Sequence, residues 1–143
     1  MRKLIVIPVV AFLAASPLQA KTLKWMDGPP GLPAGSKFAV VSGDPGKAGT
    51  FVVRARFPKG YAVPAHHHPA DEVVKVLSGK LHYGMTDKLD MAKAKTLNAG
   101  RSVTMKAAMN HWVHAASATT VQISGKGPFA ITYVDPKDDP RKK

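Results

Sequence analysis

The 143-residue sequence contains no cysteine and a single glutamate, Glu72. Without cysteine the chain forms no disulfide and offers no thiolate to a metal, so an exported domain of this kind must be held by its core, by another metal site or by self-association. Long apolar runs are also missing. The longest has twelve residues, from Leu4 to Ala15, whereas a membrane-spanning helix needs about 20.

Residues 1–20 have the order of a secretory signal peptide. Arg2 and Lys3 come first, the apolar run follows, and small residues end the segment at Ala20. A buried N-terminal strand or helix is the alternative. We therefore expect an exported protein, periplasmic or secreted, with no transmembrane segment after signal removal. The mature chain of 123 residues suffices for one domain.

Basic residues outnumber acidic ones by 21 to 9, which gives a formal net charge of +12. The lysines are scattered along the chain, whereas a nucleic-acid binder more often clusters them on one element. We expect a solvated basic surface and no nucleic-acid partner. The alternative is attraction to anionic envelope lipids or acidic sugars.

Short apolar segments separated by turn residues fill the centre of the chain. Between residues 50 and 57 polarity alternates, as in a strand with one face in the core. The expected strands are 37–42, 50–57, 61–68, 72–78, 80–85, 102–105, 110–116, 119–124 and 129–134. This pattern predicts an all-β sandwich or barrel over residues 37–134.

The flanking and linking segments are less regular. Residues 21–36 are rich in proline and glycine and predict an irregular arm across the barrel or a neighbouring subunit, with Trp25 as its anchor. Residues 87–98 form either a helical turn or a polar loop before a short strand. The polar tail, residues 135–143, is expected to be loose.

All six histidines lie between positions 66 and 114. His66 and His68 are two residues apart, so on a strand both project from one face and can converge on a cation, while His67 points the other way. A hairpin would bring Glu72 beside them. His111, from a distant facing strand, would complete a metal site.

Three further roles are open at the sequence level. His82 and His114 are most simply core or rim residues. His82 could instead line the pocket as a second proton-transfer group, and Tyr83 is its alternative by strand parity. Glu72 could act as a general base if its bond to the metal is weak.

The spacing of these residues resembles the cupin family. The first cupin signature is Gly, five residues, His-x-His, three or four residues, Glu, six residues, Gly. Every position fits this chain, at Gly60, His66, His68, Glu72 and Gly79.

The second signature fits in part. It is Gly, five residues, Pro-x-Gly, two residues, His, three residues, Asn, and Gly100 and His111 are in register with it. Lys106, Ala108 and Ala115 replace the Pro, the second Gly and the Asn. These departures concern turn geometry, and the resemblance as a whole covers roughly residues 50–134.

The resemblance implies a double-stranded β-helix, or jelly-roll barrel, with a metal inside near its mouth. The ligands would be His66, His68, Glu72 and His111. Such a set suits one divalent Fe, Mn, Ni, Zn or Cu ion. The resemblance also implies a small-molecule ligand or substrate in the barrel. Because cupins often pair through their sheets, it raises the expectation of a homodimer.

For function, we expect a metal-dependent enzyme, an oxygenase of a small phenolic or enolic compound. The alternative is a non-enzymatic binding or sensing cupin, in which the metal is structural or recognises the ligand. The fold itself does not decide between them. The polarity of the barrel lining distinguishes the enzyme from the binding protein, because a catalytic pocket should offer a proton-transfer group beyond the metal ligands.

Overall fold

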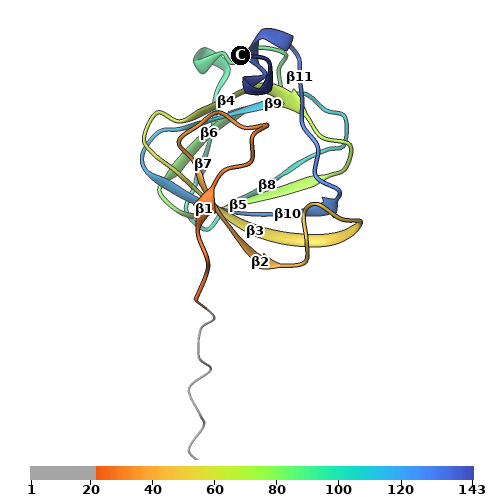
Figure 1. Ribbon diagram of the computed structural model, residues 1–143. Coiled ribbons are helices and arrows are strands. Elements are labelled where there is room, and N and C mark those ends of the chain that lie inside the picture. The colour runs from red at the N-terminus through yellow and green to blue at the C-terminus, as the bar shows by residue number, and fades with distance from the viewer. Residues whose placement is uncertain (1–21) are drawn as a thin grey trace, which may run out of the picture.

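Alternating polar and apolar residues give eleven β-strands in the computed structural model, which describes residues 22–143 (Figure 1). The signal peptide predicted at residues 1–20 lies outside the described residues. The strands form two antiparallel sheets that enclose the interior of a barrel. The prediction of an all-β jelly-roll barrel is confirmed.

Six strands make up the first sheet, in the order β1-β2-β3-β10-β5-β8. Their bounds are β1 Met26–Asp27, β2 Lys37–Ser42, β3 Gly49–Phe57, β10 Thr119–Gly127, β5 Glu72–Ser78 and β8 Ser102–Met105. The second sheet has the order β11-β4-β9-β6-β7. Its bounds are β11 Thr132–Tyr133, β4 Ala62–His67, β9 His111–Ala115, β6 Lys80–Gly84 and β7 Lys95–Asn98.

The core lies between the two sheets. On β3 the inward residues Phe51, Val53, Ala55 and Phe57 are all buried. Leu81 and Val121 from other strands have no exposed surface. Burying one such large apolar side chain contributes about 1.5–3 kcal/mol, so the inward faces of the strands supply most of the stability.

The N-terminal arm lies across the barrel. Its residues 26–27 pair with β2 as the short strand β1. Two buried tyrosines then fix it, because the Tyr61 hydroxyl donates to the Pro33 carbonyl and the Tyr133 hydroxyl donates to the Gly31 carbonyl, both at 2.7 Å. The guanidinium carbon of Arg56 lies 3.8 Å from the centre of the Trp25 ring, so Trp25 anchors the arm through a cation–π contact.

The C-terminal tail is not loose, contrary to the expectation from its composition. It forms two 3-10 turns, η2 Pro136–Asp138 and η3 Pro140–Lys142. The buried Asp139 carboxylate accepts hydrogen bonds from the Arg141 side chain, and the same guanidinium donates to the Ile131 carbonyl at 3.1 Å. This pair docks the tail, because a polar composition does not prevent a segment from packing when its charges find partners.

Residues 87–98 contain both features that the sequence left open. A single 3-10 turn, η1 Met91–Lys93, is capped by the Asp90 side chain and is followed by β7. None of the helices in residues 22–143 is long and apolar enough to cross a membrane.

Gly60, Gly79 and Gly100, the glycines of the two signatures, all have positive φ, between +83° and +85°. Their surroundings differ. A Cβ on Gly79 would lie 2.3 Å from the Ala118 carbonyl oxygen, whereas a Cβ on Gly100 would meet no atom within 4 Å. The positive φ favours glycine at both positions. At Gly79 a larger residue would also collide with the Ala118 backbone.

Gly79→Ala should therefore destabilise the protein more than Gly100→Ala. The left-handed backbone alone costs an alanine about 1–2 kcal/mol, and displacing the β9–β10 connection at Gly79 adds about 1–3 kcal/mol. Urea unfolding of both variants measures the difference. If both variants lost the same free energy of unfolding, the Ala118 backbone would move aside without cost.

Candidate metal centre

A β-bulge in β4 aims His66 into the barrel. Val63 pairs with Val113 and His66 pairs with His111, so three steps along β4 match two along β9. Strict alternation would put Val63 and His66 on opposite faces. Because of the extra residue, both line the interior cavity.

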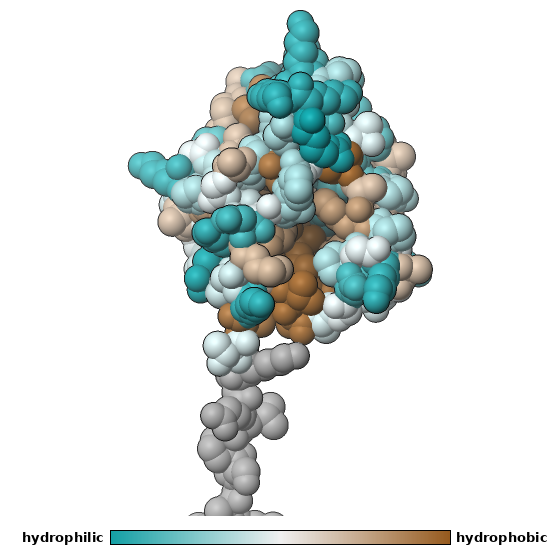
Figure 2. All heavy atoms as spheres, viewed as in Figure 1, coloured by the Kyte–Doolittle hydropathy of each residue, from teal (hydrophilic) through white to brown (hydrophobic). Residues whose placement is uncertain are grey.

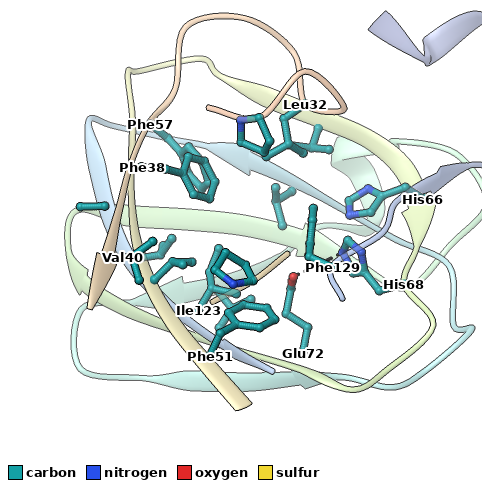
Figure 3. Close-up of a pocket in the computed structure, with 18 of the residues that line it drawn as sticks. Leu32, Phe38, Val40, Phe51, Phe57, His66, His68, Glu72, Ile123 and Phe129 are labelled. Atoms are coloured by element: carbon teal, nitrogen blue, oxygen red, sulfur yellow. Dashed lines mark ion pairs between the residues drawn. The ribbon is translucent and has the colours of Figure 1, made fainter. Parts of the chain in front are cut away.

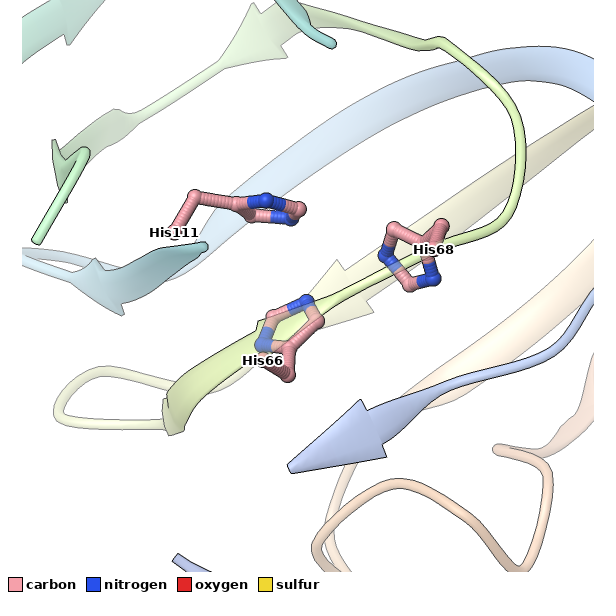
Figure 4. A group of neighbouring side chains, drawn as sticks. All are labelled: His66, His68 and His111. Atoms are coloured by element: carbon pink, nitrogen blue, oxygen red, sulfur yellow. The ribbon is translucent and has the colours of Figure 1, made fainter. Parts of the chain in front are cut away.

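The structure brings His66, His68 and His111 together (Figure 4). One ring nitrogen of each lies within 4.8 Å of those of the other two, and all three side chains are buried. His111 reaches the group from β9, the direct neighbour of β4, and not from the distant facing strand that the sequence suggested. The cross-strand pair His66–His111 has the closest rings, with centroids 4.3 Å apart.

Each of the three imidazoles is held by a backbone carbonyl at its Nδ1 atom. The acceptors are Pro64 for His66 at 2.7 Å, Ala130 for His68 at 2.8 Å and Met109 for His111 at 3.0 Å. A carbonyl only accepts, so each Nδ1 carries the hydrogen and each Nε2 presents a lone pair. This is the arrangement that orients histidine ligands around a metal.

The Nε2 atom of His111 is buried and has no hydrogen-bond partner. Buried polar atoms are normally paired, so an orphaned imidazole nitrogen needs an explanation. A cation within reach of the three Nε2 atoms would satisfy it. The residues present therefore fit a metal ion.

Glu72 enters the site from the other sheet. Its Oε2 atom lies 3.3 Å from Nε2 of His68, and the side chain points into the cavity (Figure 3). The expected hairpin is wrong, because β4 and β5 belong to different sheets and residues 68–71 cross between them. Glu72 is not part of the close nitrogen group but lies at its edge.

Burial sets the protonation of this site. It lowers the pKa of His66 to about 2, with a further contribution from repulsion by His111 and His68, and it lowers the pKa of both of those histidines too. Near neutral pH the three imidazoles are thus neutral, the form that binds metals. Burial raises the pKa of Glu72 to about 7, against a smaller opposing effect of His111.

The turn before His111 keeps its shape despite the replaced signature residues. Ala108 stands where the cupin signature has glycine, and its φ is +59°. Its amide donates to the His68 carbonyl at 2.9 Å, and the Ala107 amide donates to the Asp71 carboxylate at 2.8 Å. These bonds hold the turn against the connection that carries His68, so the departures do not displace His111.

The three histidines and Glu72 line a cavity of about 390 Å³ that is otherwise almost entirely apolar (Figures 2 and 3). Among its other lining residues are Leu32, Phe38, Val40, Phe51, Phe57, Ile123 and Phe129. Figure 2 shows apolar side chains gathered in a hollow on this face of the molecule. Among the lining residues within 22–143, Asp27 is the only other ionisable one, and it pairs with Lys37.

Neither His82 nor Tyr83 lines this cavity, so both predictions of a second proton-transfer group there are wrong. Tyr83 does point inward, but it packs against the core. His82 lies on the outer face of the second sheet, opposite His114. His67 also points outward, as predicted, and its Nδ1 atom lies 3.0 Å from the Asn110 side-chain oxygen.

Comparison with known proteins identifies the fold. The family model described as Cupin domain matches residues 53–124, just over half of the chain. The chain belongs to the cupin family. A search of curated proteins gave no match.

Solved structures share the fold at low sequence identity. A proposed acetylacetone dioxygenase from Methylibium petroleiphilum is 19% identical with a TM-score of 0.64, over 98% of this chain and 90% of that one. The DMSP lyase DddQ from Ruegeria pomeroyi is 18% identical with a TM-score of 0.60, over 78% and 60%. The polyketide cyclase RemF from Streptomyces resistomycificus is 14% identical with a TM-score of 0.59, over 75% and 76%.

Glu72→Gln should change stability in opposite directions with and without metal. In the metal-free protein the folded state holds the Glu72 proton between pH 4.5 and about 7, so stability falls as the pH rises through that range. At about 1.4 kcal/mol per pKa unit, the metal-free variant should be up to about 3 kcal/mol more stable than the parent at pH 8, and little different at pH 4.5. With metal bound, the parent should be more stable.

Urea unfolding at both pH values, with metal or with chelator, measures these differences. Asp71→Asn is the matched control, because the Ala107 amide and then Lys106 lower the pKa of that exposed carboxyl, so its loss should destabilise the protein at pH 8. If the metal-free Glu72→Gln protein were less stable than the parent at pH 8, Glu72 would not be a buried carboxylate without a compensating positive charge.

Proposed function

We propose that this cupin is a metal-dependent enzyme that oxygenates a small phenolic or enolic compound. The observation that carries the proposal is the meeting of three imidazole Nε2 atoms and one buried carboxylate at one end of an apolar cavity. The neutral imidazoles and the absence of thiolates suit Fe, Mn, Ni, Zn or Cu in the divalent state.

His66, His68 and His111 would hold the metal through Nε2, and Glu72 would be the fourth ligand. A bound divalent ion supplies Lewis acidity and, where it is redox-active, a means of using O₂. Three neutral imidazoles and one carboxylate leave such a centre with a charge of about +1. That charge favours an anionic oxygen, such as a phenolate or enolate, over a neutral ligand.

Glu72 is suited to move a proton. Its pKa of about 7 applies to the metal-free protein, and a bound cation would lower it, so Glu72 would be a carboxylate in the loaded site. As the carboxylate it would take the proton of the phenol or enol as the substrate oxygen approaches the site. The apolar walls exclude water from this exchange and strengthen its electrostatics.

The cavity also indicates the rest of the substrate. Away from the histidines its walls are aromatic and aliphatic, including Phe38, Phe51 and Ile123. A molecule that fits would carry an oxygen-bearing head and an uncharged apolar body. The Methylibium protein is described as a proposed acetylacetone dioxygenase, and acetylacetone is a small enolisable compound of this class. This likeness supports the choice of test compounds.

One observation favours the alternative of a non-enzymatic binding or sensing cupin. Apart from the four site residues and Asp27, which is paired with Lys37, the lining offers no ionisable group. A binding protein would use the same apolar cavity and metal to recognise a ligand without turnover. It would show a ligand-dependent rise in melting temperature and no product.

Export and self-association complete the proposal. Residues 1–20 support export to the periplasm or beyond, and sequencing the N-terminus of protein from a periplasmic fraction tests this against the expected start at Lys21. A homodimer is the assembly to test by sedimentation of the same material.

Oxygenase activity predicts O₂ uptake that depends on both metal and substrate. Protein loaded anaerobically with Fe(II), Mn(II), Ni(II) or Cu(II) is mixed with O₂ and a panel of phenols and enolisable diketones, with Zn(II) as the redox-inert control. At least one redox-active metal should support uptake, and His111→Ala should abolish it. Ligand-dependent stabilisation without uptake for any metal would favour the binding protein instead.

The apolar body of the substrate is tested by matched variants. Val40 lines the cavity and Val73 does not, yet the two are similarly exposed, at 42% and 37%. Val40→Phe should raise KM for substrates with a large apolar body about tenfold, the loss of roughly 1.4 kcal/mol of contact, while Val73→Phe leaves it unchanged. Equal kinetics for the two variants would place the substrate elsewhere.

A further inference from the structure

The outer face of the second sheet carries a histidine pair that the metal centre does not use. His82 on β6 lies directly opposite His114 on β9. Their ring centroids are 5.9 Å apart. Because His111 and His114 lie on opposite faces of β9, the sheet separates this pair from the interior site.

Both histidines have a buried nitrogen without a partner. Among residues 22–143, only three buried side-chain nitrogen or oxygen atoms lack a hydrogen-bond partner, and all are imidazole nitrogens. One is Nε2 of His111, in the metal centre. The other two are Nδ1 of His82 and Nδ1 of His114. Leaving such an atom unpaired costs about 1–3 kcal/mol, which a bound cation would offset.

Neither histidine forms a salt bridge with an acid of residues 22–143. The residues opposite the two histidines on the flanking strands are Thr96 and Ala62, both small and uncharged. Trp112 lies on the same face, two residues before His114, and its indole covers Gly84, where a Cβ would lie 2.5 Å from the ring. The indole therefore lies on the same outer face of the sheet as the two imidazoles.

We propose that His82 and His114 form a second cation site, for Cu²⁺, Ni²⁺ or Zn²⁺. Imidazole nitrogens bind such ions at ~2.0–2.2 Å, which places the centroids of two rings sharing one ion roughly 4.5–6.5 Å apart, and the observed 5.9 Å falls in this range. Two paired strands hold both rings, so binding orders little additional chain. With two protein ligands and water for the rest, the site should bind more weakly than the interior one.

Metal stoichiometry tests the site in protein without a polyhistidine tag. Equilibrium dialysis against Cu²⁺ should give two ions per chain for the parent and one for His82→Gln/His114→Gln. His66→Gln/His111→Gln should also give one. Thr96→Val, on the same face but without a ligand, should still bind two.

Fluorescence locates the second ion independently of any loss of folding. In Trp25→Phe/His66→Gln/His111→Gln protein Trp112 is the one remaining indole, and one equivalent of Cu²⁺ should quench it. In NMR spectra of His66→Gln/His111→Gln protein, one equivalent of Cu²⁺ should broaden the imidazole signals of His82 and His114 and leave those of His67 sharp.

Two ions per chain in His82→Gln/His114→Gln, or Cu²⁺ that broadens His67 and not His82 and His114 in the His66→Gln/His111→Gln protein, would overturn the proposal. So would a parent chain that binds a single ion. Because none of these readouts uses turnover, the outcome is separate from the success of the proposed oxygenase.

Discussion

The interior of this barrel is arranged around the lone pairs of three neutral imidazoles, which are positioned for a metal ion. Each imidazole is bonded at Nδ1 to a backbone carbonyl, so its Nε2 is turned toward the group; Nε2 of His68 lies beside Glu72, and Nε2 of His111 has no partner. Glu72 lies beside them, buried away from any permanently positive side chain among the described residues. Burial without a cation leaves a nitrogen unpaired and a carboxyl with a raised pKa, whereas a cation would satisfy both.

The rest of the structure positions these groups. The bulge in β4 turns His66 inward, the pairing of β4 with β9 places His111 against it, and the crossing from β4 to β5 brings Glu72 from the opposite sheet. The turn at Ala108 fixes the approach to His111. Strain at that one residue is small beside the cooperative strand pairing on either side, so the turn survives without the glycine that it favours.

The sequence predicted much of the fold because alternation on strands such as β3 is a strong signal of a half-buried sheet. It predicted that His66, His68 and His111 come together because their spacing is specific. It did not predict the bulge, since alternation counted from Val63 would send His66 outward. The prediction of a hairpin before Glu72 was wrong for a similar reason. A short connection has the same composition whether the chain turns back within one sheet or crosses to the other.

Parity also explains the misplacement of His82. The face of β6 on which His82 lies follows only once Leu81 is known to face the core. The sequence alone does not show this, because both neighbours of His82, Leu81 and Tyr83, have apolar side-chain surface. The tail was misjudged for a different reason, since the Asp139–Arg141 pair finds its partner at Ile131 only in the folded barrel. Long-range contacts of this kind leave no local pattern.

The central claim is that His66, His68 and His111 share one metal ion. X-ray absorption spectroscopy at the metal edge measures this directly in His82→Gln/His114→Gln protein loaded with one equivalent of metal. The account predicts three imidazole ligands at ~2.0–2.2 Å with the remaining positions filled by oxygen. A spectrum with one imidazole or none, or protein that retains no metal after dialysis, would contradict it.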